Sequence, residues 1–179
     1  MNNIQIDLAK KTLLFLENNP WKDIKLESIM SKKYSNNIKN KHDLLINLNR
    51  YFDYELKKTV TNLEDSSFKD QIFEILMARF DILSKYKISI VKLVKYFQSN
   101  PHSFIRLIPS FVESIILILT MTKSNINGIK GAALIKGTFI LYVLTTFTWI
   151  NDNTPSLEKT MTTLDKYLDN FNKILKIIT

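Results

Sequence analysis

The sequence has no cysteine, only three glycines and four prolines, and two histidines among its 179 residues. The lack of cysteine excludes a disulfide framework and thiolate chemistry, and it fits a reducing compartment. Because glycine and proline are scarce, turn signals are few and the secondary-structure elements are expected to be long. The sequence has no paired metal-ligand spacing, nucleophile elbow or phosphate loop. We therefore predict that the protein is not an enzyme and has no cofactor or metal ion.

An apolar leader is also missing from the chain as given, because the stretch Met1 to Asp7 is polar. The longest run without a charged side chain lies between Lys136 and Asp152. That run has about 15 residues, whereas a membrane-spanning helix needs roughly 20. We predict a cytoplasmic protein in which this run is buried against other parts of the protein.

Apolar residues recur at helical spacing through the chain, and no stretch alternates long enough to predict a strand. The clearest stripe is at the end: Leu157, Met161, Leu164, Leu168, Phe171, Leu175 and Ile178 advance by steps of four and three. Residues 137–150 precede it and read as a helix that is apolar on nearly all sides. Thr154 and Pro155 are expected to cap and start the final helix, and Pro109 to kink or break an earlier one. The predicted fold is an all-α bundle of about nine helices.

The order of these helices resembles that of the TetR family of transcriptional regulators. Three short N-terminal helices precede a long fourth one and a larger apolar body. Within that body, KDQIFEILMARFD at residues 69–81 looks like the opening segment of a bacterial TetR-like group. WINDNT at residues 149–154 and KTMTTLD at residues 159–165 look like its closing signature. This group is related to the TetR-fold, lipid-binding accessory proteins of ubiquinone biosynthesis.

The resemblance implies a short helix-turn-helix-like head over residues 1–48 and a ligand-binding, dimerising body over residues 49–179. Two departures bear on it. The segment between Ile29 and Lys41 is shorter than a full turn and recognition helix, and it lacks the usual turn glycine. GAALIKG at residues 131–137 stands where the ubiquinone accessory proteins carry an aromatic and basic motif.

A basic cluster lies in the predicted head of this chain, whose formal net charge is +8. Six lysines stand against Asp23 and Glu27, a composition that suits contact with DNA phosphates. The candidate DNA-binding residues are Lys22, Lys25, Lys32, Lys33, Tyr34, Asn36, Asn37, Lys39 and Lys41. The alternative is a solvated surface of a lysine- and asparagine-rich chain.

Large apolar side chains in the predicted body form the candidate site for a small apolar or lipid-like ligand. They are Phe73, Phe80, Phe97, Phe104, Phe111, Met121, Phe139, Tyr142 and Trp149. Ordinary core packing is the alternative for each of them. Arg79 also lies in an apolar pattern, and we hypothesise that it pairs with a carboxylate such as Asp81, Asp152 or Asp165.

The final helix needs a partner for its apolar stripe, and in the resembling family that partner is a second copy of the chain. The predicted homodimer contacts are Leu157, Met161, Leu164, Leu168, Phe171 and Leu175. The expected function is a TetR-like transcriptional regulator whose DNA binding is modulated by an apolar ligand. The alternative is a lipid- or quinone-precursor-binding accessory protein of ubiquinone biosynthesis, with a degenerate head, no DNA binding and peripheral membrane contact.

Overall fold

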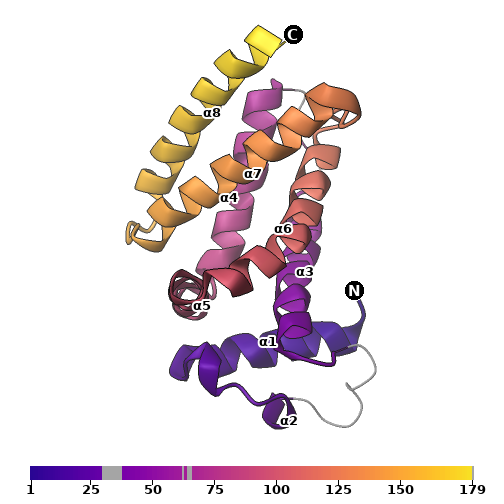
Figure 1. The fold of residues 1–179 in the computed structure, drawn as a ribbon. Coiled ribbons are helices and arrows are strands. Elements are labelled where there is room, and N and C mark those ends of the chain that lie inside the picture. Colours follow the sequence, from indigo (N-terminus) through magenta and orange to yellow (C-terminus); the bar gives the residue numbers. More distant parts are fainter. Residues whose placement is uncertain (30–37, 62, 64–65, 179) are drawn as a thin grey trace. The chain divides into compact units, whose positions relative to one another are not determined.

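The computed structural model describes residues 1–29, 38–61, 63 and 66–178, and this part of the chain contains helices and no strand (Figure 1). The all-α prediction is confirmed, but the described residues form eight α-helices rather than about nine. In order they are α1 (Asn3–Asn18), a 3₁₀ turn η1 (Trp21–Asp23), α2 (Leu26–Ile29), α3 (Lys41–Thr59), α4 (Phe68–Ser84), α5 (Lys87–Ser99), α6 (Pro101–Met121), α7 (Gly128–Ile150) and α8 (Glu158–Ile178).

Side-chain caps account for several helix starts. Asn2 and Gln5 form a reciprocal capping box on α1, with the Gln5 amide donating to Asn2 Oδ1 at 2.9 Å and the Asn2 amide donating to Gln5 Oε1 at 3.2 Å. Ser67 caps α4, because its Oγ accepts from the Asp70 amide at 3.2 Å. Each cap satisfies an amide that the first turn of a helix leaves without an intrahelical partner.

The predicted start of α7 is wrong, because α7 begins at Gly128 and so contains both Gly131 and Gly137. One local and one tertiary contact explain why glycine is used at these two positions inside the helix. A Cβ at position 131 would lie 1.9 Å from the carbonyl oxygen of Ile126, and one at position 137 would lie 2.1 Å from the ring of Phe171. These glycines allow close packing inside the helix, whereas the sequence predicts a connection at Gly128 and Gly131.

Two proline predictions also bear on helix bounds. The helix α6 is not broken at Pro109, because it runs from Pro101 to Met121, and the alternative of a kink there stays a prediction. Pro109 is exposed, so its ring faces solvent and not the buried side of α6. Pro155 does not start the final helix either, since α8 begins at Glu158. Thr154 still caps that helix, because its Oγ1 accepts from the Glu158 amide at 2.9 Å.

The chain divides into two compact units, the first formed by Met1–Lys57 with Ile82–Phe111 and the second by Lys58–Asp81 with Val112–Thr179. In the first unit, α1 packs against α5, and the Ser89 hydroxyl donates to the Leu13 carbonyl at 2.7 Å. Asn49 Nδ2 donates to the backbone carbonyl and the hydroxyl oxygen of Ser110, each at 3.0 Å. The predicted functional boundary between residues 48 and 49 stays a prediction.

In the second unit, α7 and α8 form an antiparallel pair (Figure 1). Phe80 of α4 packs on the rings of Tyr142 and Trp149, with centroid distances of 5.6 and 6.0 Å. At the surface, Lys69 Nζ lies 2.7 Å from Asp165 and 2.6 Å from Asp169, which ties α4 to α8. The aromatic contacts hold α4 against the helical pair, and the exposed ion pairs add a surface contact between α4 and α8.

Candidate functional site

An open depression with a volume of about 760 Å³ lies in the head, on the first unit. Four of the predicted DNA-contacting lysines line it, namely Lys22, Lys25, Lys39 and Lys41. All four are exposed. Asp23 and Glu27 also line the depression, so its formal charge is positive but partly balanced. The structure thus brings together lysines from η1, from the start of α2 and from the start of α3.

The start of α3 is held by a second capping box. Asn40 Oδ1 accepts from the Asp43 amide at 3.0 Å, and Asp43 Oδ2 accepts from the amides of Asn40 at 3.2 Å and Lys39 at 2.8 Å. Lys41 Nζ in turn donates to the Lys22 carbonyl at 3.0 Å. These bonds fix the backbone that carries Lys39 and Lys41 and tie it to η1. The depression is therefore a defined surface formed by segments distant in sequence.

The remaining predicted DNA-contacting residues are Lys32, Lys33, Tyr34, Asn36 and Asn37, and they lie outside the described residues. The same holds for most of the predicted turn and recognition helix, at residues 30–37. Within the described residues, the head contributes the four-residue helix α2, which ends at the buried Ile29.

The predicted ligand-binding residues are divided between the two units, and their role in binding stays a prediction. Phe80, Tyr142 and Trp149 are core residues of the second unit, with 0, 7 and 0% of their surfaces exposed. In the first unit Phe97, Phe104 and Phe111 are half-buried, and their successive ring centroids are 5.9 Å apart. Phe73 and Phe139 are half-buried in the second unit. Of the nine residues, Met121 is the one that lines a described pocket.

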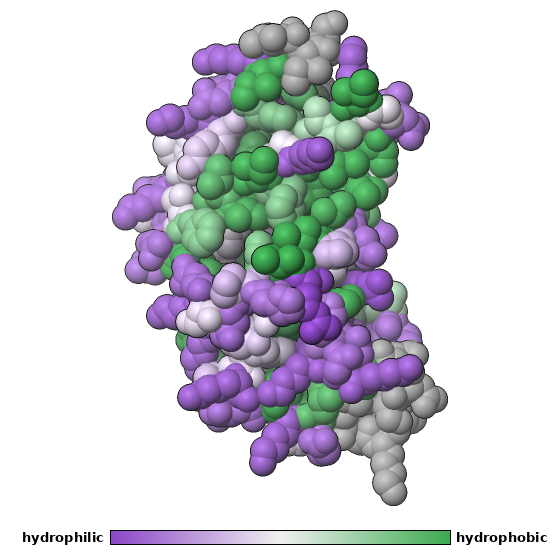
Figure 2. All heavy atoms as spheres, viewed as in Figure 1, coloured by the Kyte–Doolittle hydropathy of each residue, from purple (hydrophilic) through white to green (hydrophobic). Residues whose placement is uncertain are grey.

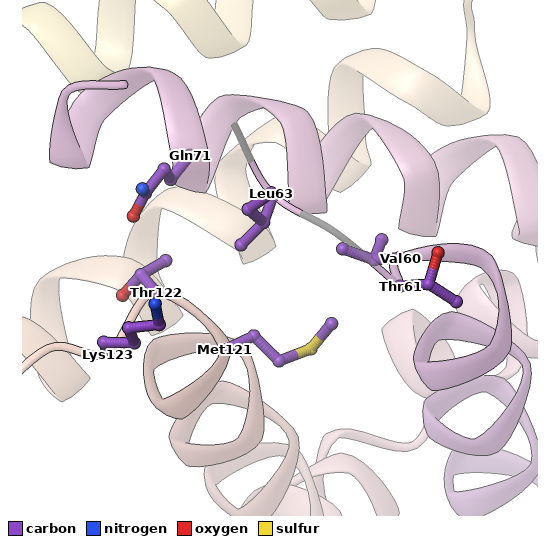
Figure 3. Close-up of a pocket in the computed structure, with 7 residues that line it drawn as sticks. All are labelled: Val60, Thr61, Leu63, Gln71, Met121, Thr122 and Lys123. Atoms are coloured by element: carbon purple, nitrogen blue, oxygen red, sulfur yellow. The ribbon is translucent and has the colours of Figure 1, made fainter. Parts of the chain in front are cut away.

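That pocket has a volume of about 370 Å³ and lies in the second unit (Figure 3). Its lining residues are Val60, Thr61, Leu63, Gln71, Met121, Thr122 and Lys123. They come from the link after α3, from the first turns of α4 and from the end of α6. Apart from Met121, sequence reasoning missed them, because they are scattered along the chain in three short segments without a shared motif.

The charged side chain of Arg79 is buried in the core of the second unit, with 1% of its surface exposed. Arg79 Nε donates to the Tyr142 hydroxyl at 3.2 Å, and the guanidinium carbon lies 5.4 Å from the centroid of the Tyr142 ring. Of the carboxylates proposed as its partner, Asp165 pairs with Lys69, and Asp152 accepts hydrogen bonds from Thr154 and Thr160. Arg79 therefore links α4 to the inward face of α7.

Two threonines on that same face of α7, Thr138 and Thr145, are fully buried, and their hydroxyls have no hydrogen-bond partner among the described residues. A buried hydroxyl without a partner loses its hydration and gains nothing in return. Replacing Thr145 with valine, which has nearly the same shape, is expected to raise the free energy of unfolding by about 1 kcal/mol. Urea denaturation checks this, with the exposed Thr162 replaced by valine as the control. A less stable Thr145→Val variant would show that the hydroxyl has a stabilising partner.

The predicted dimer contacts on α8 are divided between core and surface. Leu157, Leu164 and Leu168 are buried within a single copy of the chain, with 5, 0 and 2% exposed. Phe171 and Leu175 are half-buried, and Met161 is 38% exposed. Much of the final stripe is therefore already covered by the chain's own helices.

The apolar surface left open lies mainly on α7. Ile140, Leu144 and Phe147 are 56, 44 and 45% exposed, and their spacing of four and three places them on one face of the helix. Figure 2 shows apolar side chains gathered over this region of the second unit. We call Ile140, Leu144 and Phe147 the α7 stripe. The expectation that this helix is buried on all sides is wrong for a single copy, because its partners in the chain cover only one face.

Two helices, α6 and α7, are long and apolar enough to cross a membrane by length and composition. The most apolar window of α6 is 33% buried and that of α7 is 28% buried. Core helices of soluble proteins pass the same test, so it does not decide between a membrane and a protein partner. No protein-family model matches the chain, and no curated protein matches it.

Proposed function

We propose that the protein is a TetR-like transcriptional regulator that binds DNA through its basic head as a homodimer. The observation that carries this proposal is the depression lined by Lys22, Lys25, Lys39 and Lys41, whose exposed side chains converge from three segments. Ammonium groups on one surface neutralise DNA phosphates and release condensed counterions. Base contacts would come from the neighbouring segment at residues 30–37.

The α7 stripe supports the homodimer. Three large apolar side chains on one helical face, with Met161 exposed on the adjacent helix, form a surface that would be covered by a second copy. A two-fold axis beside α7 would pair the stripe with itself, since an isologous interface uses the same patch on both copies. DNA-binding dimers of helix-turn-helix type need such an interface to set the spacing of their two heads.

A ligand in the body would act on the head through α3. This helix is continuous from Lys41, which lines the depression, to Thr59, and the pocket residues Val60 and Leu63 follow directly. A ligand that contacts these residues and favours one position of α3 would shift the population of DNA-binding conformations.

Replacing Leu144 with glutamate is expected to convert the dimer to a monomer, because a buried carboxylate without a partner is strongly unfavourable at an apolar interface. Sedimentation velocity measures the mass in solution, and Asn170→Glu on the exposed face of α8 is the matched control. A wild-type protein that is monomeric at micromolar concentration would contradict the dimer. So would a Leu144→Glu variant that remains dimeric.

DNA binding is tested with DNA from upstream of the protein's own gene, at several salt concentrations and with unrelated DNA as competitor. The triple variant Lys22→Gln, Lys25→Gln and Lys39→Gln is expected to bind at least 10-fold more weakly near 0.15 M salt. Its slope of log affinity against log salt should fall by about 2 to 3. The control replaces the exposed Lys57, Lys95 and Lys130 with glutamine and so changes the net charge equally. Equal losses in both variants would mean that the depression is no DNA site.

The second candidate is a lipid- or quinone-precursor-binding accessory protein that does not bind DNA. The observation that favours it is the small buried share of α6 and α7, together with the α7 stripe. Wild-type binding that is weak, equal on any DNA and lost at 0.15 M salt would favour this candidate. Mass spectrometry of the purified protein should then find a lipid bound to it.

A further inference from the structure

The pocket beside Met121 is polar at one side and mostly apolar elsewhere, with Thr61 beside Val60 as the exception. In Figure 3, Gln71, Thr122 and Lys123 lie together at one side, and Leu63 and Met121 lie between them and Val60. Lys123 carries the one formal charge among the seven lining residues. A volume of about 370 Å³ lies within the range of small-molecule sites. The arrangement suits a molecule with an anionic head and a short apolar tail.

The backbone of Lys123 is a second, independent observation. Lys123 has a φ of 55°, in the left-handed region that favours glycine. It ends α6 in a Schellman motif, with the Lys123 amide donating to Thr120 O at 3.1 Å and the Ser124 amide donating to Leu119 O at 3.3 Å. Glycine is the usual residue at this position, and other residues are strained there. The chain thus carries a lysine side chain at a position where its backbone is unfavourable.

Strain of this kind gathers at functional sites, where the side chain has a use that offsets its cost. Here the strained residue is also the cation at the edge of the pocket. The Thr122 hydroxyl already donates to Leu119 O at 2.7 Å, so it supports the turn. The ammonium group of Lys123 is the lining group that suits a carboxylate by its charge.

We propose that this pocket binds a small amphiphilic carboxylate, with its head at Lys123 and its tail against Val60, Leu63 and Met121. The proposal names a ligand class for the body and in this respect rests on the ligand-binding part of the proposed function. Its test uses no DNA, so its failure is distinguishable from failure of the DNA assay.

The experiment titrates the full chain with decanoate, below its micelle concentration, by isothermal titration calorimetry. Decanol and decylammonium serve as neutral and cationic probes of the same length. Decanoate is expected to bind tightest, and octanoate should bind up to about 16-fold more weakly, at about fourfold per methylene group. Decanol or decylammonium binding as tightly as decanoate would overturn the proposal.

The variant Lys123→Gly removes the ammonium group and leaves the residue that the turn prefers. It is expected to unfold at the same or a higher temperature than wild type, yet to bind decanoate at least 10-fold more weakly. Lys123→Arg is expected to restore most of the affinity. Unchanged decanoate affinity in Lys123→Gly would overturn the proposal. If Leu144→Glu lost decanoate affinity and Lys123→Gly kept it, the ligand would bind on the α7 stripe. That result would also overturn the proposal.

Discussion

Replacing Asp152 with alanine is expected to lower the free energy of unfolding by about 3 kcal/mol, because hydrogen bonds to a charged group are worth roughly 1.5–3 kcal/mol each. Asp152 is 1% exposed and sits in the corner between α7 and α8. Its Oδ2 accepts from the amide and the hydroxyl of Thr160, each at 2.8 Å. Its Oδ1 accepts from the amide of Thr154 at 3.1 Å and from its hydroxyl at 2.6 Å. Alanine would leave these donors without their acceptor.

Urea denaturation at one fixed protein concentration measures this loss, since the stability of a dimer depends on concentration. The control is Asp165→Ala on α8, whose side chain is 53% exposed. We expect the control to change stability by less than about 1 kcal/mol, as exposed ion pairs contribute little. Equal stabilities of the two variants would show that the corner does not depend on the Asp152 carboxylate.

The same carboxylate makes stability depend on pH. Burial raises the pKa of Asp152, but the hydrogen bonds from Thr154 and Thr160 lower it more, so the folded-state pKa lies well below the ordinary value. A group with a depressed folded-state pKa stabilises the fold above its unfolded pKa of about 3.9. That contribution is lost as the pH falls from about 4 toward the folded-state pKa. The difference in stability between wild type and Asp152→Asn should therefore be largest above pH ~5 and shrink below pH ~4.

Replacing Arg79 with alanine is expected to cost about 3 kcal/mol or more, because it removes a large buried side chain and a polar partner of Tyr142 at once. Arg79 is 1% exposed in the core of the second unit. The cavity left beside Phe80 and Tyr142 would lie between α4 and α7, which these aromatic rings hold together. Asp152→Ala and Arg79→Ala both act on the packing of α7, the helix that carries the proposed dimer surface.

Urea denaturation again provides the measurement, with the exposed Lys95→Ala as control, for which a change within about 0.5 kcal/mol is expected. Arg79→Met separates volume from polarity, since methionine fills much of the space of the arginine side chain but cannot donate to the Tyr142 hydroxyl. If the Arg79→Ala and Lys95→Ala variants were equally stable, the hypothesis that Arg79 fixes the packing of α4 and α7 would be wrong.

Local patterns in the sequence determined which segments are helical and where several of them begin and end. The apolar residues of α1 (Asn3–Asn18) and α5 (Lys87–Ser99) recur at helical spacing, and each helix ends at an asparagine C-cap. Ser67 and Asp70, three residues apart, form the cap that marks the start of α4. These signals are readable because helical spacing and caps involve residues three or four positions apart.

Contacts between distant residues decided the rest, and no local pattern records them. The helix α7 begins at Gly128 rather than at Gly137, and Gly137 leaves room for the ring of Phe171, which is 34 residues further along the chain. The apolar stripe of α8 looked like a dimer surface, but α8 packs on α7 and buries Leu164 and Leu168 within the chain. The Lys123 pocket joins three segments separated by many residues. The neighbouring helices decide whether the apolar face of α7 or that of α8 is covered within the chain. The spacing of side chains within one helix does not contain that information.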